Sequence, residues 1–334
     1  MPDYRRIIEE RERQTLSPYA ALSAETRGRE YPIDPCPVRT AFVRDRDRII
    51  HCKSFRRLKH KTQVFLQPEG DHYRTRLTHT LEVSRLARTV TRALALNEDL
   101  AEAASLGHDL GHTPFGHAGE RALNSIYPGG FKHYEQSLRV VDVLERDGRG
   151  LNLCYETRMG ILHHTYGSPD DTREATVVRL CDRIAYINHD LDDAMRAGII
   201  KPEDVPALIR ERCGERNSER INSLVSDLIA NSTDGVIKMS PKMREVYDFF
   251  HKYMFDAVYH NPLAKSEESK VYGIIEGLYG HYTKHPEDMP EDFRGVMENE
   301  GVERAACDYI SGMTDGYAME KFGEIFIPFA WTVK

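Results

Sequence analysis

A histidine and an aspartate stand side by side at His108 and Asp109, near the end of an alanine-rich segment that reads as a helix. Leu100 and Ala104 precede His108 on one helix face, so its imidazole lies on the apolar side, with Asp109 at the edge of the same core. Burying an imidazole and a carboxylate together costs free energy unless a partner neutralises them, and a metal ion is the most common partner. A structural histidine bonded to a local aspartate is the alternative.

Two further segments could complete a metal site. His79 lies one turn into the preceding helix, and a later helix carries Asp182. Tyr186, His189 and Asp190 follow Asp182 at i+4, i+7 and i+8, so all four share one helix face. Apolar neighbours indicate that this face points inward, where a carboxylate could complete a set of two imidazoles and two carboxylates. A solvated acidic stripe is the alternative.

Some nearby side chains have simpler interpretations. Asp192 and Asp193 are expected to lie on such a solvated stripe. The pair His163 and His164 follows Leu162 and is expected to be structural, with a supporting role near the site as the alternative.

A second pair of residues could move protons. Thr113 and Pro114 predict the N-cap and first residue of a new helix. His117 and Glu120 would then meet on one face, where the carboxylate can fix the imidazole tautomer and raise its basicity. We therefore take them as the general acid and base candidates, with a plain surface ion pair as the alternative.

Charge and histidine are unevenly distributed along the 334 residues. The chain carries a net charge of −7, yet residues 44–92 contain 13 Lys and Arg against 5 Asp and Glu, which leaves −15 for the remainder. Ten of the 15 histidines fall between His51 and His164. An acidic protein with one basic, histidine-rich section is suited to holding an anion at one place, and it is unlike a generally basic nucleic-acid binder.

Composition excludes several classes of protein. The longest apolar stretch, 325–333, is interrupted by Pro328 and is far shorter than the roughly 20 residues of a membrane-spanning helix. The first six residues lack the apolar core of a secretion signal. Six cysteines form no CxxC pair, which excludes a zinc ribbon and favours a reduced, cytoplasmic chain.

These residues require helices to position them. Periodicity predicts helices at 78–96, 99–110, 172–196, 242–259, 269–279 and 302–322. One short β-hairpin is predicted from 63–66 and 72–75. The expected fold is all-α, a single compact unit over 1–334 with a helical C-terminal extension.

Six ordered blocks resemble the deoxynucleoside triphosphate triphosphohydrolase (dGTPase) branch of the HD superfamily of phosphohydrolases, and most closely its shorter bacterial members. The blocks are FRRL at 55–58 with KTQVF at 61–65, GDHYRTRLTHTLEV at 70–83, GHDLGHTPFGHAGE at 107–120, FKHYEQS at 131–137, DRIAY at 182–186 with HDL at 189–191, and DYISGMTD at 308–315. The resemblance implies an HD metal-binding core at about 75–195 and a helical extension at about 200–334.

The resemblance also implies roles for individual residues. One divalent cation would be held by His79, His108, Asp109 and Asp182. That mixed ligand set suits Mn, Fe, Co, Ni or Zn, and Mg less well. His117 and Glu120 match positions that take part in catalysis. Arg76 and Arg183 match phosphate-binding positions, and His112 and His133 match positions that line the phosphate and leaving-group side. Tyr186 and Asp190 match positions that contact the deoxyribose, and Gln63 is a further candidate contact to sugar or base.

The residues alone lead to metal-assisted hydrolysis of a phosphate ester. The resemblance adds the substrate and the bond: a dNTP, with dGTP among the candidates, is split into deoxynucleoside and tripolyphosphate, and the enzyme is expected to be a homo-oligomer. One alternative is an HD nucleotidase or phosphodiesterase acting on other nucleotides. Another is a slow nucleotide-sensing regulator, for which the basic segment permits binding of single-stranded DNA.

Overall fold

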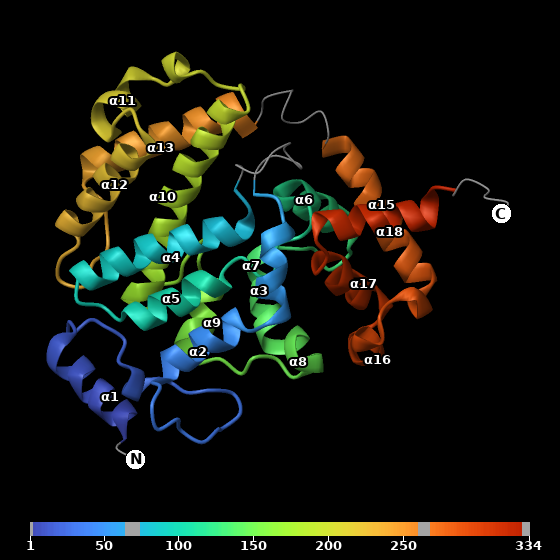
Figure 1. Ribbon diagram of the computed structural model, residues 1–334, viewed down its shortest axis with the longest axis horizontal. Helices are drawn as coiled ribbons and strands as arrows, with labels where there is room; N and C mark the ends of the chain where they lie inside the picture. The colour runs from blue at the N-terminus through green and yellow to red at the C-terminus, as the bar shows by residue number, and fades with distance from the viewer. Residues whose placement is uncertain (1–2, 64–73, 260–267, 329–334) are drawn as a thin grey trace, which may run out of the picture.

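The computed structural model describes residues 3–63, 74–259 and 268–328, and these are all-α, as predicted (Figure 1). The helices are α1 (Tyr4–Thr15), α2 (Ala41–Ile50), α3 (Lys53–Arg57), α4 (Arg76–Ala93), α5 (Glu98–Gly107), α6 (Gly116–Ile126), α7 (His133–Arg139), α8 (Glu145–Gly148), α9 (Tyr155–Leu162), α10 (Arg173–Arg196), α11 (Ala207–Cys213), α12 (Asn217–Asn231), α13 (Pro241–Met254), α15 (Glu268–Lys284), α16 (Arg294–Glu300), α17 (Val302–Ser311) and α18 (Asp315–Phe326). None of the helices in these ranges is both long enough and apolar enough to span a membrane.

Three helices form the centre of the molecule. α4 packs against both α5 and α10, and α2 and α9 cover α5 (Figure 1). Small residues such as Ala101 and Ala104 on α5 let these helices approach closely, and Val178 and Ile184 of α10 fill the same core. The helices predicted at 78–96, 99–110 and 172–196 are thereby confirmed as α4, α5 and α10, although α4 and α5 each end three residues before the predicted bound.

The C-terminal part packs in two places. α11, α12 and α13 extend the core that surrounds α10, and a π-helical turn (Phe255–Tyr259) continues α13 over the rest of the predicted 242–259 helix. α15 is the helix predicted at 269–279, and it packs with α6, α17 and α18 around a separate apolar cluster (Figure 1).

The single helix predicted at 302–322 was wrong, because the structure has two helices there. α17 ends at Ser311 with Gly312 as its C-cap, and α18 begins at Asp315. The Thr314 side chain accepts a hydrogen bond from Tyr317 N at 3.3 Å, so it caps a new helix instead of continuing the old one. Periodicity does not reveal this break, because both helices keep apolar residues on one side.

The predicted hairpin falls mostly on residues 64–73, which lie outside the described residues. At its base Thr62 and Thr75 pair in an isolated antiparallel bridge, and Arg76 N donates to Lys61 O at 3.1 Å. Thr75 and Thr78 then form a capping box at the start of α4. The two ends of the segment therefore lie side by side, directly before the first turn of α4.

A buried carboxylate joins α7 to α17. Asp308 is completely buried and accepts from Arg139 Nη2 at 2.7 Å, from Gln136 Nε2 at 2.8 Å and from Arg304 Nη2. Arg139 also pairs with Glu300, whose side chain is 39% exposed. Asp308 thus neutralises two arginines that lie between the central helices and the C-terminal cluster.

We expect Asp308→Asn to lower the free energy of unfolding by about 3 kcal/mol, because it removes the buried counter-charge that the two largely buried guanidinium groups of Arg139 and Arg304 share. Urea denaturation followed by circular dichroism measures this loss. The matched control is Glu300→Gln, which removes an exposed partner of the same Arg139 and should cost at most about 1 kcal/mol. Equal losses in the two variants would show that Asp308 is no more important than a surface ion pair.

Candidate functional site

The histidine–aspartate pair lies in a turn and not on a helix. The prediction of a helix through residue 110 was wrong, since α5 ends at Gly107 and His108 is its C-cap. Ser137 Oγ of α7 donates to His108 O at 2.6 Å and accepts from Gly111 N at 2.9 Å, so α7 binds the backbone of this turn. Gly111 is required there, because a Cβ would lie 2.1 Å from Ser137 N.

The structure brings the four predicted metal ligands together. His79 Nε2 lies 3.0 Å and His108 Nε2 lies 3.6 Å from Asp182 Oδ1, and His108 Nε2 lies 3.4 Å from Asp109 Oδ1. Ligand atoms of His79, His108 and Asp109 all lie within 4.8 Å of one another, and these three residues are buried. α4, the turn after α5 and the middle of α10 each contribute to this cluster, which we call the HD cluster.

The hydrogen bonds of His108 fit a metal ligand. Its Nδ1 lies 2.6 Å from Ser105 O, a contact that requires Nδ1–H to donate, so in the neutral ring Nε2 is the nitrogen that carries the lone pair. That Nε2 is buried and has no hydrogen-bond partner among the described residues. An unpaired buried lone pair beside two carboxylates is what a divalent cation would satisfy, and two imidazoles with two carboxylates suit Mn, Fe, Co, Ni or Zn.

Electrostatics in the HD cluster favour a cation as well. Burial opposes ionisation of Asp109 and Asp182, but neighbouring imidazoles and, for Asp109, Arg76 outweigh it and hold both pKa values below the usual range. Burial also opposes protonation of His108, yet Asp109 and Asp182 raise the pKa of His108 to about 9. Both carboxylates are therefore ionised and attract positive charge: without a metal they hold a proton on His108, which a bound cation would displace.

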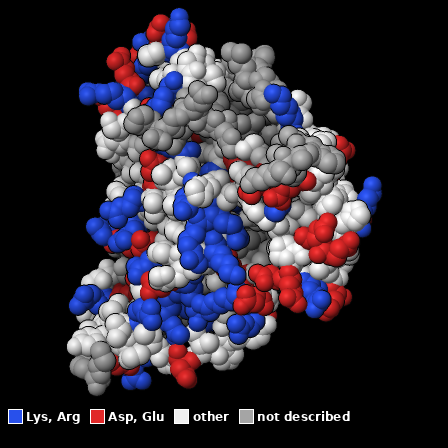
Figure 2. Space-filling model, turned by 45° about the vertical axis from the view of Figure 1, so that its right-hand side comes forward, with Lys and Arg blue, Asp and Glu red and all other residues white. Residues whose placement is uncertain are grey.

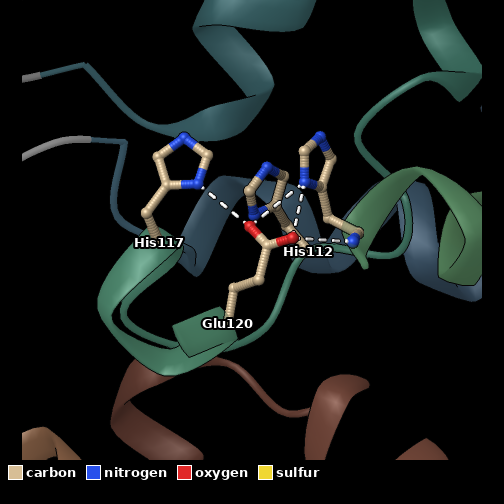
Figure 3. Close-up of side chains that lie close together, drawn as sticks. His112, His117 and Glu120 are labelled. Carbon is tan, nitrogen blue, oxygen red and sulfur yellow. Dashed lines mark hydrogen bonds and ion pairs between the residues drawn. The ribbon is translucent and has the colours of Figure 1, made fainter. Parts of the chain in front are cut away.

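A second cluster consists of His112, His117, Glu120 and His133, which we call the acid–base cluster. Glu120 Oε2 lies 3.0 Å from His117 Nδ1 (Figure 3). Glu120 Oε1 lies 2.9 Å from both Nδ1 and the backbone N of His133. Burial opposes ionisation of Glu120, but its bonds to the two imidazoles outweigh this and hold its pKa below the usual range. One carboxylate therefore orients two imidazoles.

The start of α6 differs from the prediction. Thr113 and Pro114 are not its N-cap and first residue, because α6 begins at Gly116 after Phe115, whose φ is 63°. Thr113 Oγ1 donates to Gly116 O at 2.9 Å, so its oxygen is used within a tight turn. Asp315 Oδ1 accepts from Phe115 N at 2.9 Å and stabilises that left-handed residue from α18. His117 and Glu120 still meet three residues apart on the first turn of α6.

His112 connects the two clusters. Its Nε2 lies 3.5 Å from Asp109 Oδ1, and its ring stacks on that of His133 with centroids 4.2 Å apart. Burial, and then the charge of Arg76, hold the pKa of His112 well below 6.5. His112 is therefore a neutral imidazole between a carboxylate of the HD cluster and a histidine of the acid–base cluster.

Arg76 also contacts Asp109, at the junction where His112 connects the two clusters. Its Nη1 donates to Asp109 Oδ2 at 2.8 Å, whereas its Nε and Nη2 are buried without partners among the described residues. Gly116 leaves space beside Nη2, where a Cβ would lie 3.2 Å away. Buried guanidinium donors cost free energy unless an acceptor meets them, and an anionic oxygen is the strongest one.

The remaining predicted substrate contacts lie on α10 and at Gln63. Tyr186 and Asp190 follow Asp182 on the same helix face, as the spacing predicts, and Tyr259 donates its hydroxyl to Asp190. Arg183 donates to Thr165 O at 2.8 Å, so one of its guanidinium nitrogens is already used. The side-chain oxygen of Gln63 is buried without a described partner.

For His164 the structure favours the supporting role that the sequence left as an alternative, and it places Asp193 differently from the prediction. His164 is buried, with its ring centroid 5.0 Å from that of His108 and its Nε2 3.2 Å from His133 Nε2. The adjacent histidine pair was the only sequence signal for it. Asp193 is buried instead of solvated, because Arg74 Nη1 pairs with it at 3.0 Å and with Asp192 at 3.1 Å.

Comparison with known proteins identifies related chains. The HD domain family matches residues 76–187, and the phosphohydrolase-associated domain family matches residues 237–324. A deoxyguanosinetriphosphate triphosphohydrolase-like protein of Caldanaerobacter subterraneus subsp. tengcongensis is 53% identical over 98% of this chain and 97% of its own length. A protein of the same name from Clostridium perfringens is 49% identical over 97% and 98%. One from Desulfatibacillum aliphaticivorans is 46% identical over 97% and 98%.

Asp190 should make stability depend on pH. Burial raises the pKa of Asp190 to about 7, against about 3.9 in an unfolded chain. Between these values the folded state binds more protons than the unfolded one, so this group lowers stability as the pH rises from about 4 to about 7, and no further above that. Asp190→Asn removes the effect. The free energy of unfolding of the variant, relative to that of the parent, should therefore rise by up to about 1.4 kcal/mol per pH unit in this window.

Urea titrations of both proteins at pH 4–8 measure this difference. The control is Asp192→Asn, on the same helix but half-exposed and paired with Arg74. If the curves of the Asp190→Asn variant and the parent run parallel, Asp190 is ionised throughout the window.

Proposed function

The chain belongs to the deoxyguanosinetriphosphate triphosphohydrolase-like family of HD-domain phosphohydrolases, and we propose that it hydrolyses deoxynucleoside triphosphates to deoxynucleoside and tripolyphosphate. The observation that carries this proposal is the junction at Asp109, where the HD cluster, the unpaired donors of Arg76 and the acid–base cluster meet. dGTP, the nucleotide in the names of the relatives, is the first substrate to test.

The HD cluster is proposed to hold one divalent cation through His79, His108, Asp109 and Asp182. When bound, this cation supplies positive charge that polarises a phosphoryl oxygen and lowers the pKa of the attacking water. His108 is oriented for this role, because its bond to Ser105 O uses Nδ1–H and leaves Nε2 as the nitrogen that would bind the cation in place of a proton.

His117 and Glu120 are proposed to move the proton. Hydrolysis joins a water oxygen to the α-phosphorus and breaks the bond from phosphorus to the 5′ oxygen, which leaves with a proton. The ionised Glu120 accepts from Nδ1 of His117, so Nε2 of His117 is the atom that exchanges a proton with the reacting groups. His117 is 63% exposed, in contrast to the buried His112 and His133, which gives a substrate direct access to that nitrogen.

The phosphates are proposed to contact the donors around this junction. Arg76 offers two guanidinium nitrogens that have no partner among the described residues, and His112 offers a neutral imidazole beside Asp109. His133 and Arg183 complete the proposed phosphate contacts. Figure 2 shows Lys and Arg side chains gathered in a band over one face of the molecule, which would favour the approach of a triphosphate.

The deoxyribose is proposed to contact α10. A ring of Tyr186 stacked under the sugar leaves little room for a 2′-hydroxyl, and Asp190 can accept from the 3′-hydroxyl. In support of this, Asp190 Oδ1 is buried with no partner among the described residues. Gln63, whose side-chain oxygen is likewise unpaired, is a further contact to sugar or base.

Product analysis tests the reaction. The protein is loaded with Mn²⁺, and separately with Co²⁺ or Mg²⁺, and incubated with each dNTP and rNTP in ¹⁸O-labelled water. We expect deoxynucleoside and tripolyphosphate, with the label in the tripolyphosphate. Phosphate or pyrophosphate as the only inorganic product would indicate a nucleotidase, and bound nucleotide without products would indicate a sensor.

His117→Ala should lower turnover by about 10²–10⁴, the usual contribution of a general acid or base, while metal content and nucleotide binding stay as in the parent. Steady-state kinetics, equilibrium dialysis of nucleotide and elemental analysis measure the three quantities. His285→Ala is a matched control, because His285 is also exposed and paired with a carboxylate, Glu287 at 3.5 Å, outside both clusters. Unimpaired turnover of the His117 variant would remove His117 from the mechanism.

A further inference from the structure

The two carboxylate oxygens of Asp190 have different surroundings. The residue is buried, with 4% of its surface exposed, and Tyr259 donates its hydroxyl to Oδ2. Oδ1 is also buried, but it has no hydrogen-bond partner among the described residues. A buried acceptor without a donor costs free energy, and a hydroxyl group of a bound molecule would remove that cost. Tyr259 thus occupies one oxygen of the carboxylate, and the other is available to a ligand.

α13 contacts α10 at earlier positions as well. Tyr247 donates its hydroxyl to Arg183 O at 3.4 Å, and the ring of His251 meets the ring of Tyr186 edge-on, with centroids 6.1 Å apart. Both of these residues of α10 are among the proposed substrate contacts. α13 and its continuation therefore support the proposed site along α10, and the hydroxyl at Asp190 is the last of these contacts.

The helix changes its geometry directly before it reaches Asp190. Residues Phe255–Tyr259 form a π-helical turn after α13, and the rings of His251, Phe255 and Tyr259 lie in a row, with centroids 4.9 and 5.2 Å apart. Hydrogen bonds from i to i+5 widen a helix and turn each following side chain to a new side, and such turns are frequent at functional sites. The π-helical turn therefore sets the direction of Tyr259, and the row of rings supports it there.

We propose that Tyr259 determines sugar specificity by positioning Asp190 for the 3′-hydroxyl of the substrate. The inference rests on the proposed function, in which Asp190 accepts a hydrogen bond from that hydroxyl. Because Tyr259 bonds Oδ2, the carboxylate is oriented before the nucleotide binds, and Oδ1 is the oxygen left to accept. A group that is already oriented loses less freedom on binding. The enzyme would therefore select nucleotides that have a 3′-hydroxyl over 2′,3′-dideoxynucleotides more strongly than an unsupported carboxylate could.

Tyr259→Phe tests the proposal, because it removes the hydroxyl and keeps the ring against Phe255. The quantity measured is the specificity ratio: kcat/KM for dGTP divided by kcat/KM for 2′,3′-dideoxyGTP, with the Mn²⁺-loaded enzyme at about pH 8, above the pKa of Asp190. We expect this ratio to fall about tenfold, the effect of ordering one side chain, because the loss affects the nucleotide that offers a 3′-hydroxyl. An unchanged ratio would overturn the proposal, since damage to the fold lowers both values alike. A rise in the ratio would also overturn it, because the hydroxyl of Tyr259 would then compete with the substrate.

Tyr253→Phe is the matched control. Tyr253 lies on α13 and donates its hydroxyl to Asp204 O at 3.2 Å, an exposed contact outside the set of proposed substrate contacts. The control removes the same atom from the same helix, so the specificity ratio should stay at the value of the parent. An equal fall in both variants would assign the effect to the stability of α13 and not to Asp190.

Asp190→Ala separates failure of this inference from failure of the proposed function. It should remove most of the preference for the 3′-hydroxyl, and adding Tyr259→Phe should then change the ratio no further, because the two residues act through one hydrogen bond. If Asp190→Ala lowers the ratio and Tyr259→Phe does not, the sugar contact stands and this inference falls. If the parent shows no preference for the 3′-hydroxyl, the sugar contact falls and the inference falls with it. If the parent hydrolyses neither nucleotide, the proposed function fails, and dissociation constants from equilibrium dialysis give the ratio instead.

Discussion

The charge of one buried carboxylate, Asp109, constrains the whole site. It is 3% exposed, and a charge at that depth is tolerated only with partners around it. The structure supplies them from separate elements: Arg76 at the start of α4, His108 in its own turn and His112 on the way to α6. Each of these partners also has a ring or guanidinium nitrogen without a hydrogen-bond partner among the described residues, so the side chains that neutralise Asp109 also present the groups that the proposed metal and phosphate would require.

The C-terminal helices hold the segment between the two clusters in place. Lys61 is buried and donates to His112 O and, at 2.9 Å, to Ser311 O, while Asp315 accepts from Phe115 N and Thr62 N. The backbone from His112 to Phe115 is therefore bound at both ends by residues from outside the central helices. A turn that contains a left-handed Phe115 needs this support, because such a conformation costs about 1–3 kcal/mol outside glycine.

The sequence predicted the helices whose positions follow from hydrophobic periodicity. It did not predict the helix boundaries that depend on side-chain hydrogen bonds. The central helices α4, α5 and α10 were predicted, and the spacing of Asp182, Tyr186 and Asp190 placed them on one face. The start of α6 and the break before α18 depend on how Thr113 and Thr314 use their hydroxyls, which spacing does not encode. The supporting role of His164 was left as an alternative for a related reason: this residue follows the end of α9, so only the packing of α9 against α7 brings it to His133.

Lys61 also shows why a charge count overstates the number of phosphate contacts. It lies in the basic segment 44–92, yet burial holds its pKa well below the usual value and its ammonium group binds two backbone carbonyls. Arg74 of the same segment is used by Asp192 and Asp193. Arg76 differs because only one of its three guanidinium nitrogens has a partner among the described residues. Unsatisfied donors at the junction, and not the total charge, therefore carry the proposal of a phosphate site there.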